Sequence, residues 1–102
     1  FQYLQKFPVD IIKIDRVFIH DIEENECNNS IVSAIIAMSK KMRIGTVAEG
    51  VETEAQFKYL YRLKCEEVQG YLTGKPMSSA QVQQLLEKQK ASLNNPPIAI
   101  NQ

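Results

Sequence analysis

Three short strand-like runs, each followed by a segment with helical spacing, constrain the fold of this chain more than any other feature. The runs are residues 10–15 (DIIKID), 44–49 (IGTVAE) and 65–71 (CEEVQGY). Strands that alternate with helices over short connections pair in parallel, because each helix carries the chain back across the sheet. The pattern therefore predicts an α/β fold, which is either a doubly wound sheet or part of a closed barrel.

The helices are predicted from apolar spacing and from capping residues. The first begins near Asn29 or Ser30 and turns one apolar stripe toward the core, made of Ile31, Ala34, Ile35, Met38 and Met42. The second spans about 54–63 after a capping box of Thr53 and Gln56, and its predicted buried residues are Phe57, Leu60 and Tyr61. The third follows a capping box of Ser78 and Gln81, carries Val82, Leu85 and Leu86, and ends at residues 94–97 (NNPP), where a tail begins. Residues 1–7 are interpreted as the end of an earlier helix that stops at Pro8.

Charge and cysteine content exclude several classes of protein. Lysine plus arginine and aspartate plus glutamate each total 12, so no net field favours nucleic acid or an anionic membrane surface. Cys27 and Cys65 lie far apart without a CxxC pattern, which argues against a zinc site or a disulfide scaffold and favours reduced thiols in a cytoplasmic protein. The longest apolar stretch, residues 31–38, is too short to span a bilayer, and no signal-peptide pattern is visible.

Polar residues stand at the carboxyl end of each predicted strand, where parallel α/β folds gather their functional side chains. They are Lys13 with Asp15 on the first strand, Glu49 on the second and Gln69 on the third. A lysine between isoleucines needs a carboxylate partner, which Asp15 or Glu49 can supply. Glu49 precedes Gly50, where a substrate can approach closely, and Glu52 follows in the same loop. Two carboxylates in one loop can bind a divalent cation or orient a water molecule for attack on phosphorus.

Each of these residues also has a purely structural interpretation. Lys13 and Asp15 can form a structural ion pair, and Glu52 can be an acid that favours a helix N-terminus. Gln69 alone indicates nothing specific. His20 has no second imidazole in the chain and is interpreted as a surface residue, not as a metal ligand. Spacing alone thus supports a site but does not name its substrate.

Three longer segments carry a resemblance to a known family. Residues 7–19 (FPVDIIKIDRVFI), 46–57 (TVAEGVETEAQF) and 66–76 (EEVQGYLTGKP) resemble, in this order, the last three strand signatures of EAL domains. The resemblance covers about residues 1–86 and implies the C-terminal βαβαβα portion of a TIM-like (β/α)8 barrel with one reversed strand near its start. It assigns residues 1–90 to the C-terminal part of the domain, which supplies strands six to eight, and residues 91–102 to a C-terminal tail.

The resemblance also implies an activity and a set of site residues. Members of the family hydrolyse cyclic di-GMP to the linear dinucleotide with Mg²⁺ or Mn²⁺. Lys13 matches the family lysine that contacts the attacking water and a nearby phosphate, and Glu49 matches the glutamate that binds metal or positions water. Asp15 matches the acid that borders the metal centre, Glu52 matches the second glutamate of the EGVE loop, and Gln69 matches the glutamine that closes the site near the second metal.

The remaining family motifs are absent from this sequence. The motif that names the family, a metal-binding asparagine, a further glutamate and the paired aspartates of the DDFGTG loop lie upstream of Phe1 in a complete member. The isolated chain is therefore expected to be inactive. Arg43 stands where many members have glycine at a helix end, which predicts a less favourable helix stop.

The resemblance also sets the expected partners and location. The partners are cyclic di-GMP, the rest of the barrel and further copies of the chain in a homo-oligomer, without DNA binding and without a membrane segment in this chain. A cytoplasmic location is expected, and the parent protein can be attached to a membrane sensor. The alternative function is a degenerate EAL domain that binds cyclic di-GMP or a protein partner without hydrolysis.

Overall fold

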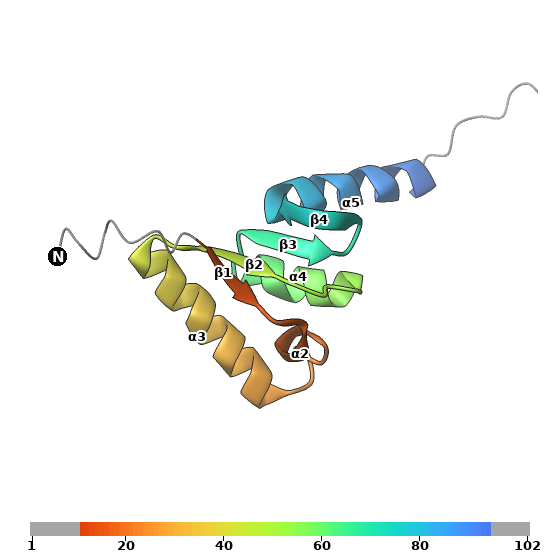
Figure 1. Cartoon of the computed structure of the whole chain (residues 1–102). Helices are drawn as coiled ribbons and strands as arrows, with labels where there is room; N and C mark the ends of the chain where they lie inside the picture. The colour runs from red at the N-terminus through yellow and green to blue at the C-terminus, as the bar shows by residue number, and fades with distance from the viewer. Residues whose placement is uncertain (1–10, 95–102) are drawn as a thin grey trace, which may run out of the picture.

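A computed structural model describes residues 11–94 of the chain, in which strands and helices follow the predicted order with two additions (Figure 1). The elements are β1 (Ile11–Ile14), α2 (Arg16–Ile19), α3 (Glu26–Met42), β2 (Gly45–Ala48), α4 (Glu54–Arg62), β3 (Glu67–Gly70), β4 (Thr73–Ser78) and α5 (Ser79–Asn94). The additions are α2 and β4, which no periodic pattern indicated. The predicted helix end at residues 1–7 and the tail after residue 94 lie outside the described residues.

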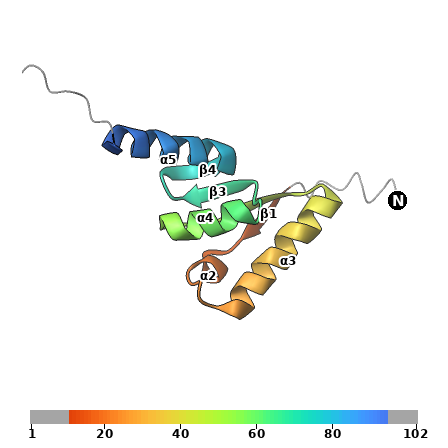
Figure 2. The same cartoon turned by 180° about the vertical axis from the view of Figure 1, so that it is seen from behind.

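The four strands form one sheet in the order β1-β2-β3-β4 (Figures 1 and 2). β1 pairs with β2 and β2 with β3 in parallel, which confirms the predicted α/β class. The third predicted strand–helix unit differs, because β4 pairs antiparallel with β3 before α5 begins. The chain reverses at Leu72, whose φ of 64° is the left-handed conformation that a tight turn can use. As a result α5 runs in the same direction as β3 in Figure 1, not back across the sheet.

A single hydrophobic cluster joins the sheet to the helices. Ile14, Ala48 and Val68 are neighbours in register and are at most 2% exposed. The helical residues that pack in the same cluster include Ile19, Val32, Ile36, Phe57, Leu60, Val82 and Leu86. The other face of β1 is open, since Ile11 is 53% exposed and the Lys13 side chain 67%. Ile14 therefore points inward and Lys13 outward, as alternation along a strand requires.

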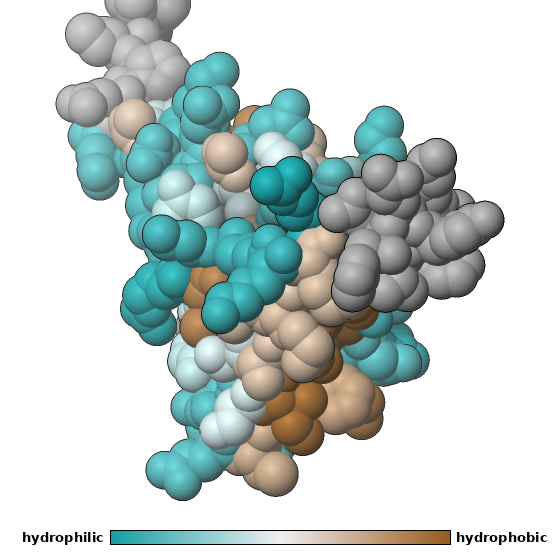
Figure 3. Space-filling model, turned by 90° about the vertical axis from the view of Figure 1, so that its left-hand side faces the viewer, coloured by the Kyte–Doolittle hydropathy of each residue, from teal (hydrophilic) through white to brown (hydrophobic). Residues whose placement is uncertain are grey.

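The first long helix, α3, differs from its prediction in both its start and its buried face. It begins at Glu26, because Asn25 is the N-cap and its side chain accepts a hydrogen bond of 2.9 Å from the Asn28 backbone N–H. Its buried residues are Val32, Ile36 and Ser39. Of the predicted stripe, Ile35 packs against the core, whereas Ala34 is exposed, Ile31 is 38% exposed and Met38 and Met42 are about 60% exposed. Figure 3 shows hydrophobic surface on the side of the molecule where α3 lies.

The two later helices follow their predictions more closely. The capping box of Thr53 and Gln56 is present at the start of α4, and Phe57 and Leu60 are fully buried. Tyr61 was wrongly predicted to be buried and is 40% exposed. In α5 the buried apolar residues are Val82 and Leu86, whereas Leu85 is 37% exposed. The predicted cap at the start of α5 is present in part, because Ser78 Oγ accepts a hydrogen bond from the Gln81 backbone N–H.

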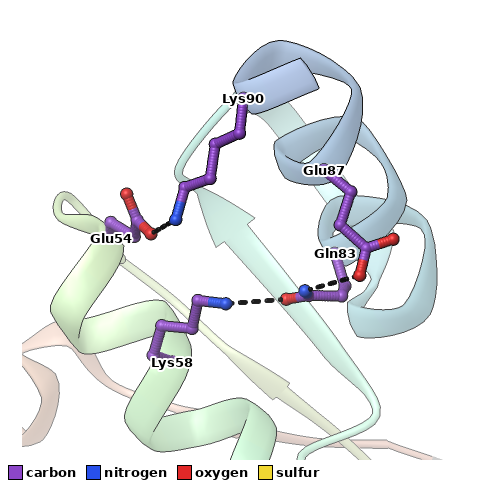
Figure 4. Close-up of polar contacts among 5 residues, drawn as sticks. All are labelled: Glu54, Lys58, Gln83, Glu87 and Lys90. Atoms are coloured by element: carbon purple, nitrogen blue, oxygen red, sulfur yellow. Dashed lines mark hydrogen bonds and ion pairs between the residues drawn. The ribbon is translucent and has the colours of Figure 1, made fainter. Parts of the chain in front are cut away.

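Polar contacts join α4 to α5 across their exposed sides (Figure 4). Lys90 Nζ lies 2.6 Å from Glu54 Oε2, and Lys58 Nζ lies 3.4 Å from Gln83 Oε1. The hydrogen bond and charge of Lys90 lower the pKa of the Glu54 carboxyl. These contacts are exposed and contribute little to stability.

Basic residues with left-handed backbone end both α3 and α4. Arg43 has a φ of 58°, and the backbone N–H groups of Arg43 and Ile44 donate to the carbonyl oxygens of Lys40 and Ser39. Lys64 has a φ of 67°, and Cys65 N–H donates to the Leu60 oxygen in the same pattern. Both ends are therefore Schellman motifs without the usual glycine. The prediction that Arg43 makes a less favourable helix stop agrees with this geometry.

Candidate active site at the carboxyl ends of the parallel strands

The parallel register places three predicted site residues on one face of the sheet. Lys13 is paired with Val47, and Val47 with Glu67, so these positions share a face. Because side chains alternate along a strand, Glu49 and Gln69, two positions further along their chains, point to that same face. It is the face opposite Ile14, Ala48 and Val68, which belong to the core. Lys13, Glu49 and Gln69 thus lie near the same ends of β1, β2 and β3.

Lys13 and Glu49 form an ion pair across the ends of β1 and β2. Lys13 Nζ lies 4.0 Å from Glu49 Oε2, and the side chains are 67% and 35% exposed. The Glu49 backbone N–H donates to the Ile14 carbonyl oxygen at 2.9 Å, which continues the parallel ladder beyond β2. A pair so exposed contributes about 0–1 kcal/mol to stability. Stability therefore does not explain the placement of these two charges together.

Asp15 has a local role that differs from the predicted ion pair with Lys13. It is the N-cap of α2, and its Oδ1 accepts a hydrogen bond of 2.9 Å from the Val17 backbone N–H. The ion-pair partner of Lys13 within residues 11–94 is Glu49, so the structural interpretation of Lys13 with Asp15 was wrong. Asp15 Oδ2 faces no hydrogen-bond donor in the described part of the chain, and Asp15 lines a cavity with Glu49.

Two glycines let the loops after the strands approach one another. Gly50 has a φ of +72°, and a Cβ at this position would lie 2.2 Å from Arg16 Cβ. Gly70 has a φ of +118°, and its Cβ would lie 2.5 Å from the Val51 carbonyl oxygen. The Val51 backbone N–H also donates to the Gln69 carbonyl oxygen at 3.1 Å. Backbone hydrogen bonds hold the ends of β1, β2 and β3 together, and the lack of side chains at these two positions permits the close approach.

Two open cavities lie beside one another at these strand ends. One, of about 450 Å³, is lined by Asp15, Arg16, Glu49, Gly50, Gln69, Gly70 and Gly74. The other, of about 640 Å³, is lined by Asp15, Arg16, Val17, His20, Asp21, Asn28, Gly50 and Glu52. Glu49 and Gln69 thus share one cavity, while Glu52 opens into the neighbouring cavity. Asp15, Arg16 and Gly50 border both.

Glu52 and His20 line the cavity of about 640 Å³. Glu52 stands just before the N-cap Thr53, and the acid in the first turn of α4 is Glu54. The Glu52 side chain is exposed, and His20 is exposed as well, in agreement with its interpretation as a surface residue. In the same cavity, a hydrogen bond of 2.8 Å from Asn28 lowers the pKa of the Asp21 carboxyl. Asp21 therefore joins the segment after α2 to the first turns of α3.

Arg16 and Gln56 are the residues near the site that sequence reasoning missed. Arg16 directly follows Asp15, is exposed, and is the basic side chain that borders both cavities, whereas Lys13 lines neither of them. Gln56 was predicted only as a helix cap, yet its Nε2 also donates to the His20 carbonyl oxygen at 3.0 Å. Arg16 directly follows Lys13–Asp15 in the chain, and this position at a strand end could have indicated that it lies near the site. The contact between Gln56 and His20 joins residues 36 positions apart, and no sequence pattern could have indicated it.

The described residues offer a partial set of metal ligands. Glu49 and Asp15 border one cavity and present carboxylate oxygens, the donors that Mg²⁺ and Mn²⁺ prefer. Residues 11–94 contain no group of three or more histidine, cysteine, aspartate or glutamate side chains that could hold a metal ion. Cys27 is exposed, Cys65 is buried, and both are free thiols. Asp15 and Glu49 alone offer two carboxylates, fewer ligands than a divalent cation takes.

Comparison with known proteins identifies the family. The family model for the EAL domain matches residues 1–76. The chain belongs to the EAL domain family. Residues 7–19, 46–57 and 66–76, which carry the resemblance, therefore lie in or at the edge of the matched region.

The EAL relatives in sequence include two proteins of Pseudomonas aeruginosa. The chain is 45% identical over 80 residues to the bifunctional diguanylate cyclase/cyclic di-GMP phosphodiesterase MucR, and the aligned region covers 78% of the chain and 12% of MucR. It is 40% identical over 100 residues to the cyclic di-GMP phosphodiesterase NbdA, and the aligned region covers 98% of the chain and 13% of NbdA. The chain thus spans about an eighth of the length of these relatives.

Solved EAL structures resemble the structure of this chain as well. The PaMucR phosphodiesterase in complex with c-di-GMP has a TM-score of 0.63 and 44% identity, over 79% of this chain and 33% of that chain. The EAL domain of Mycobacterium smegmatis DcpA has a TM-score of 0.61 and 40% identity, over 85% of this chain and 39% of that chain. EAL domains have a TIM-barrel fold, so the sheet of this chain is part of such a barrel. No helix within residues 11–94 is long and apolar enough to cross a membrane.

Proposed function

We propose that this chain supplies one side of the active site of a metal-dependent cyclic di-GMP phosphodiesterase. The observation that carries the proposal is the convergence of Lys13, Glu49 and Gln69 on one face at the carboxyl ends of three parallel strands. Relatives named as cyclic di-GMP phosphodiesterases, such as NbdA, support the choice of substrate. The reaction adds one water molecule across a phosphodiester bond and leaves the linear dinucleotide.

Glu49 and Lys13 have complementary tasks in this proposal. The Glu49 carboxylate accepts a hydrogen bond from the attacking water and orients a lone pair of that water toward phosphorus. Lys13, 4.0 Å from Glu49, supplies a positive charge for the phosphate oxygens, whose negative charge increases as the new P–O bond forms. The bond from phosphorus to the departing ribose oxygen breaks, and that oxygen gains the proton that the water loses. Both side chains are exposed enough to reach a substrate above the sheet.

Gln69, Asp15 and Glu52 define the edges of the proposed site. The Gln69 amide can donate to a phosphate oxygen or accept from a ribose hydroxyl in the cavity that it shares with Glu49. Asp15, which caps α2, can present its second oxygen to the same cavity. Glu52 lies in the neighbouring cavity and is proposed to shape the loop between Glu49 and α4. Bound Mg²⁺ or Mn²⁺, held in part by Glu49, would neutralise phosphate charge and lower the pKa of the attacking water.

The test is a hydrolysis assay on a complete EAL domain that carries this chain as its carboxyl portion. With cyclic di-GMP and Mn²⁺, the linear dinucleotide should accumulate, and a metal chelator should stop its formation. Binding of cyclic di-GMP without hydrolysis would instead identify the domain as a binding module. Absence of both binding and hydrolysis would contradict the proposal.

The remainder of the barrel is the proposed partner of the open surfaces. Ile11 on β1 and the exposed apolar side of α3, with Met38 and Met42, are surfaces that neighbouring strands and helices cover in a closed barrel. Without those neighbours, we propose that copies of the chain associate through the same surfaces and form a homo-oligomer. The domain boundary at residue 90, with residues 91–102 as a tail, remains part of this proposal.

A further inference from the structure

One buried side chain connects the loop that carries Glu49 and Glu52 to α2. Gln56 is only 4% exposed, although it is a polar residue on the first turn of α4. Its Oε1 accepts hydrogen bonds from the backbone N–H groups of Glu52 at 2.7 Å and Thr53 at 3.1 Å. Its Nε2 donates to the His20 carbonyl oxygen at 3.0 Å. The amide therefore holds two separate backbone segments at once.

The two segments are those that border the candidate site. Glu52 belongs to the loop that begins at Glu49, where β2 ends. His20 ends the short helix that Asp15 caps, where β1 ends. The start of the first loop is already tied to the end of β1, because the Glu49 backbone N–H donates to the Ile14 carbonyl oxygen, and Gly50 lies close to Arg16. The Gln56 bonds tie the far end of that loop, at Glu52, to the end of α2 at His20.

An amide is needed because the site demands a donor and an acceptor on one side chain. A carboxylate at position 56 would still accept from Glu52 and Thr53, but it would place an oxygen without a proton against the His20 carbonyl oxygen. In a buried site such a contact is unfavourable, since neither oxygen has a donor or solvent to compensate. Helix capping alone requires only the acceptor part of this arrangement.

We propose that Gln56 is a positioning residue of the active site, which holds the Glu49–Glu52 loop against α2 and so fixes Glu49 relative to Asp15. This inference rests on the proposed phosphodiesterase function. Gln56 does not touch the substrate in this arrangement; it acts through the backbone of Glu52 and of His20. Its loss should therefore lower the turnover number more than it weakens substrate binding.

The experiment compares three variants in a complete EAL domain that carries this chain. Gln56→Glu removes the donor to His20 and keeps the acceptor. Thr53→Ala removes the other half of the capping box, in which Thr53 Oγ1 accepts from the Gln56 backbone N–H at 3.1 Å, without touching the His20 contact. Gln84→Glu makes the same chemical change as the first variant at an exposed position of α5.

Two readouts are measured, kcat with KM for cyclic di-GMP, and the ¹³C resonance of the His20 carbonyl. Gln56→Glu should lower kcat on the order of 10- to 100-fold with KM within about twofold, because misplacement by an ångström has effects of this size. It should also shift the His20 carbonyl resonance, which loses its donor. Thr53→Ala and Gln84→Glu should leave that resonance in place and keep kcat within about threefold of the wild type.

The outcomes distinguish failure of the positioning role of Gln56 from failure of the proposed phosphodiesterase function. Equal loss of kcat in Gln56→Glu and Thr53→Ala would reduce Gln56 to a helix cap and overturn the inference. An unchanged His20 resonance in Gln56→Glu would overturn it as well, because the connection to α2 would not exist. A wild-type domain without turnover would contradict the proposed function itself, and the positioning role would fail with it.

Discussion

Replacement of Gly50 by alanine is the sharpest structural test of how the strand ends are brought together. The backbone φ of +72° costs an alanine about 1–2 kcal/mol relative to glycine. The new Cβ would lie 2.2 Å from Arg16 Cβ, an atom that no side-chain rotation can move, and overpacking of this kind adds about 1–3 kcal/mol. Gly50→Ala should therefore lower the free energy of unfolding by about 2–5 kcal/mol.

The assay is thermal unfolding followed by circular dichroism at one fixed protein concentration, because association also changes the apparent midpoint. A loss of this size corresponds to a fall of at least about 8 °C for a domain of this length. Gly74→Ala is the matched control, since no atom lies within 4 Å of its added Cβ, and it should change stability by no more than about 0.5 kcal/mol. Arg16→Gly in the Gly50→Ala background should restore only the part of the lost stability that comes from the contact with Arg16 Cβ. Equal midpoints for the two single variants would refute the reasoning.

Three further predictions follow from other parts of the structure. In urea unfolding, Arg43→Gly should raise the free energy of unfolding by about 1 kcal/mol or less, because glycine relieves the left-handed strain at φ 58°. Lys41→Gly inside the same helix should lower the free energy of unfolding. The pKa of Glu54 is lowered in the folded state, so the stability contributed by its carboxylate is present above the unfolded pKa of 4.5. This stability is lost as pH falls through the folded pKa. Lys90→Gln should therefore flatten the pH dependence of the melting temperature in that acidic range. Light scattering should find the 102-residue chain as a dimer or larger assembly without cyclic di-GMP hydrolysis, and a well-folded monomer would contradict the proposed association.

Local signals explain which elements the sequence could predict. The strands β1 and β2 are β-branched runs beside turn residues, and the capping box of Thr53 and Gln56 marks the start of α4 within one residue. β4 was missed because Gly74 and Pro76 lower the strand propensity of residues 73–78, and only pairing with β3 makes this segment a strand. α2 is a helix of four residues, too short for a periodic pattern.

The face of α3 shows where periodicity is insufficient. Apolar residues occupy more than one side of this helix, and both Ile31 with Met38 and Val32 with Ile36 fit a helical stripe. Only the packing against the sheet selects the second pair, which is buried. The start of the helix was ambiguous for a similar reason, because asparagines at positions 25, 28 and 29 are all good caps and the hydrogen bond forms at the first.

The sequence could predict those parts of the candidate site whose position depends only on where the strands end. Lys13, Glu49 and Gln69 lie together because parallel strands place their carboxyl ends at one edge, a rule that needs only the order of the elements. The partner of Lys13 was not predictable, because Asp15 is closer in the chain but its carboxylate caps α2. The Gln56 contact to His20 depends on how two loops fold against each other, and no local pattern reports that.

The role of Glu49 tests the central claim most directly. Glu49→Gln keeps the shape of the side chain and removes the charge that orients the water or binds metal, so the variant should fold with an unchanged circular dichroism spectrum. In a complete EAL domain that carries this chain, we expect its rate of cyclic di-GMP hydrolysis with Mn²⁺ to fall about 100-fold or more. Turnover within a few-fold of the wild type would contradict the assignment of this strand end as the active site.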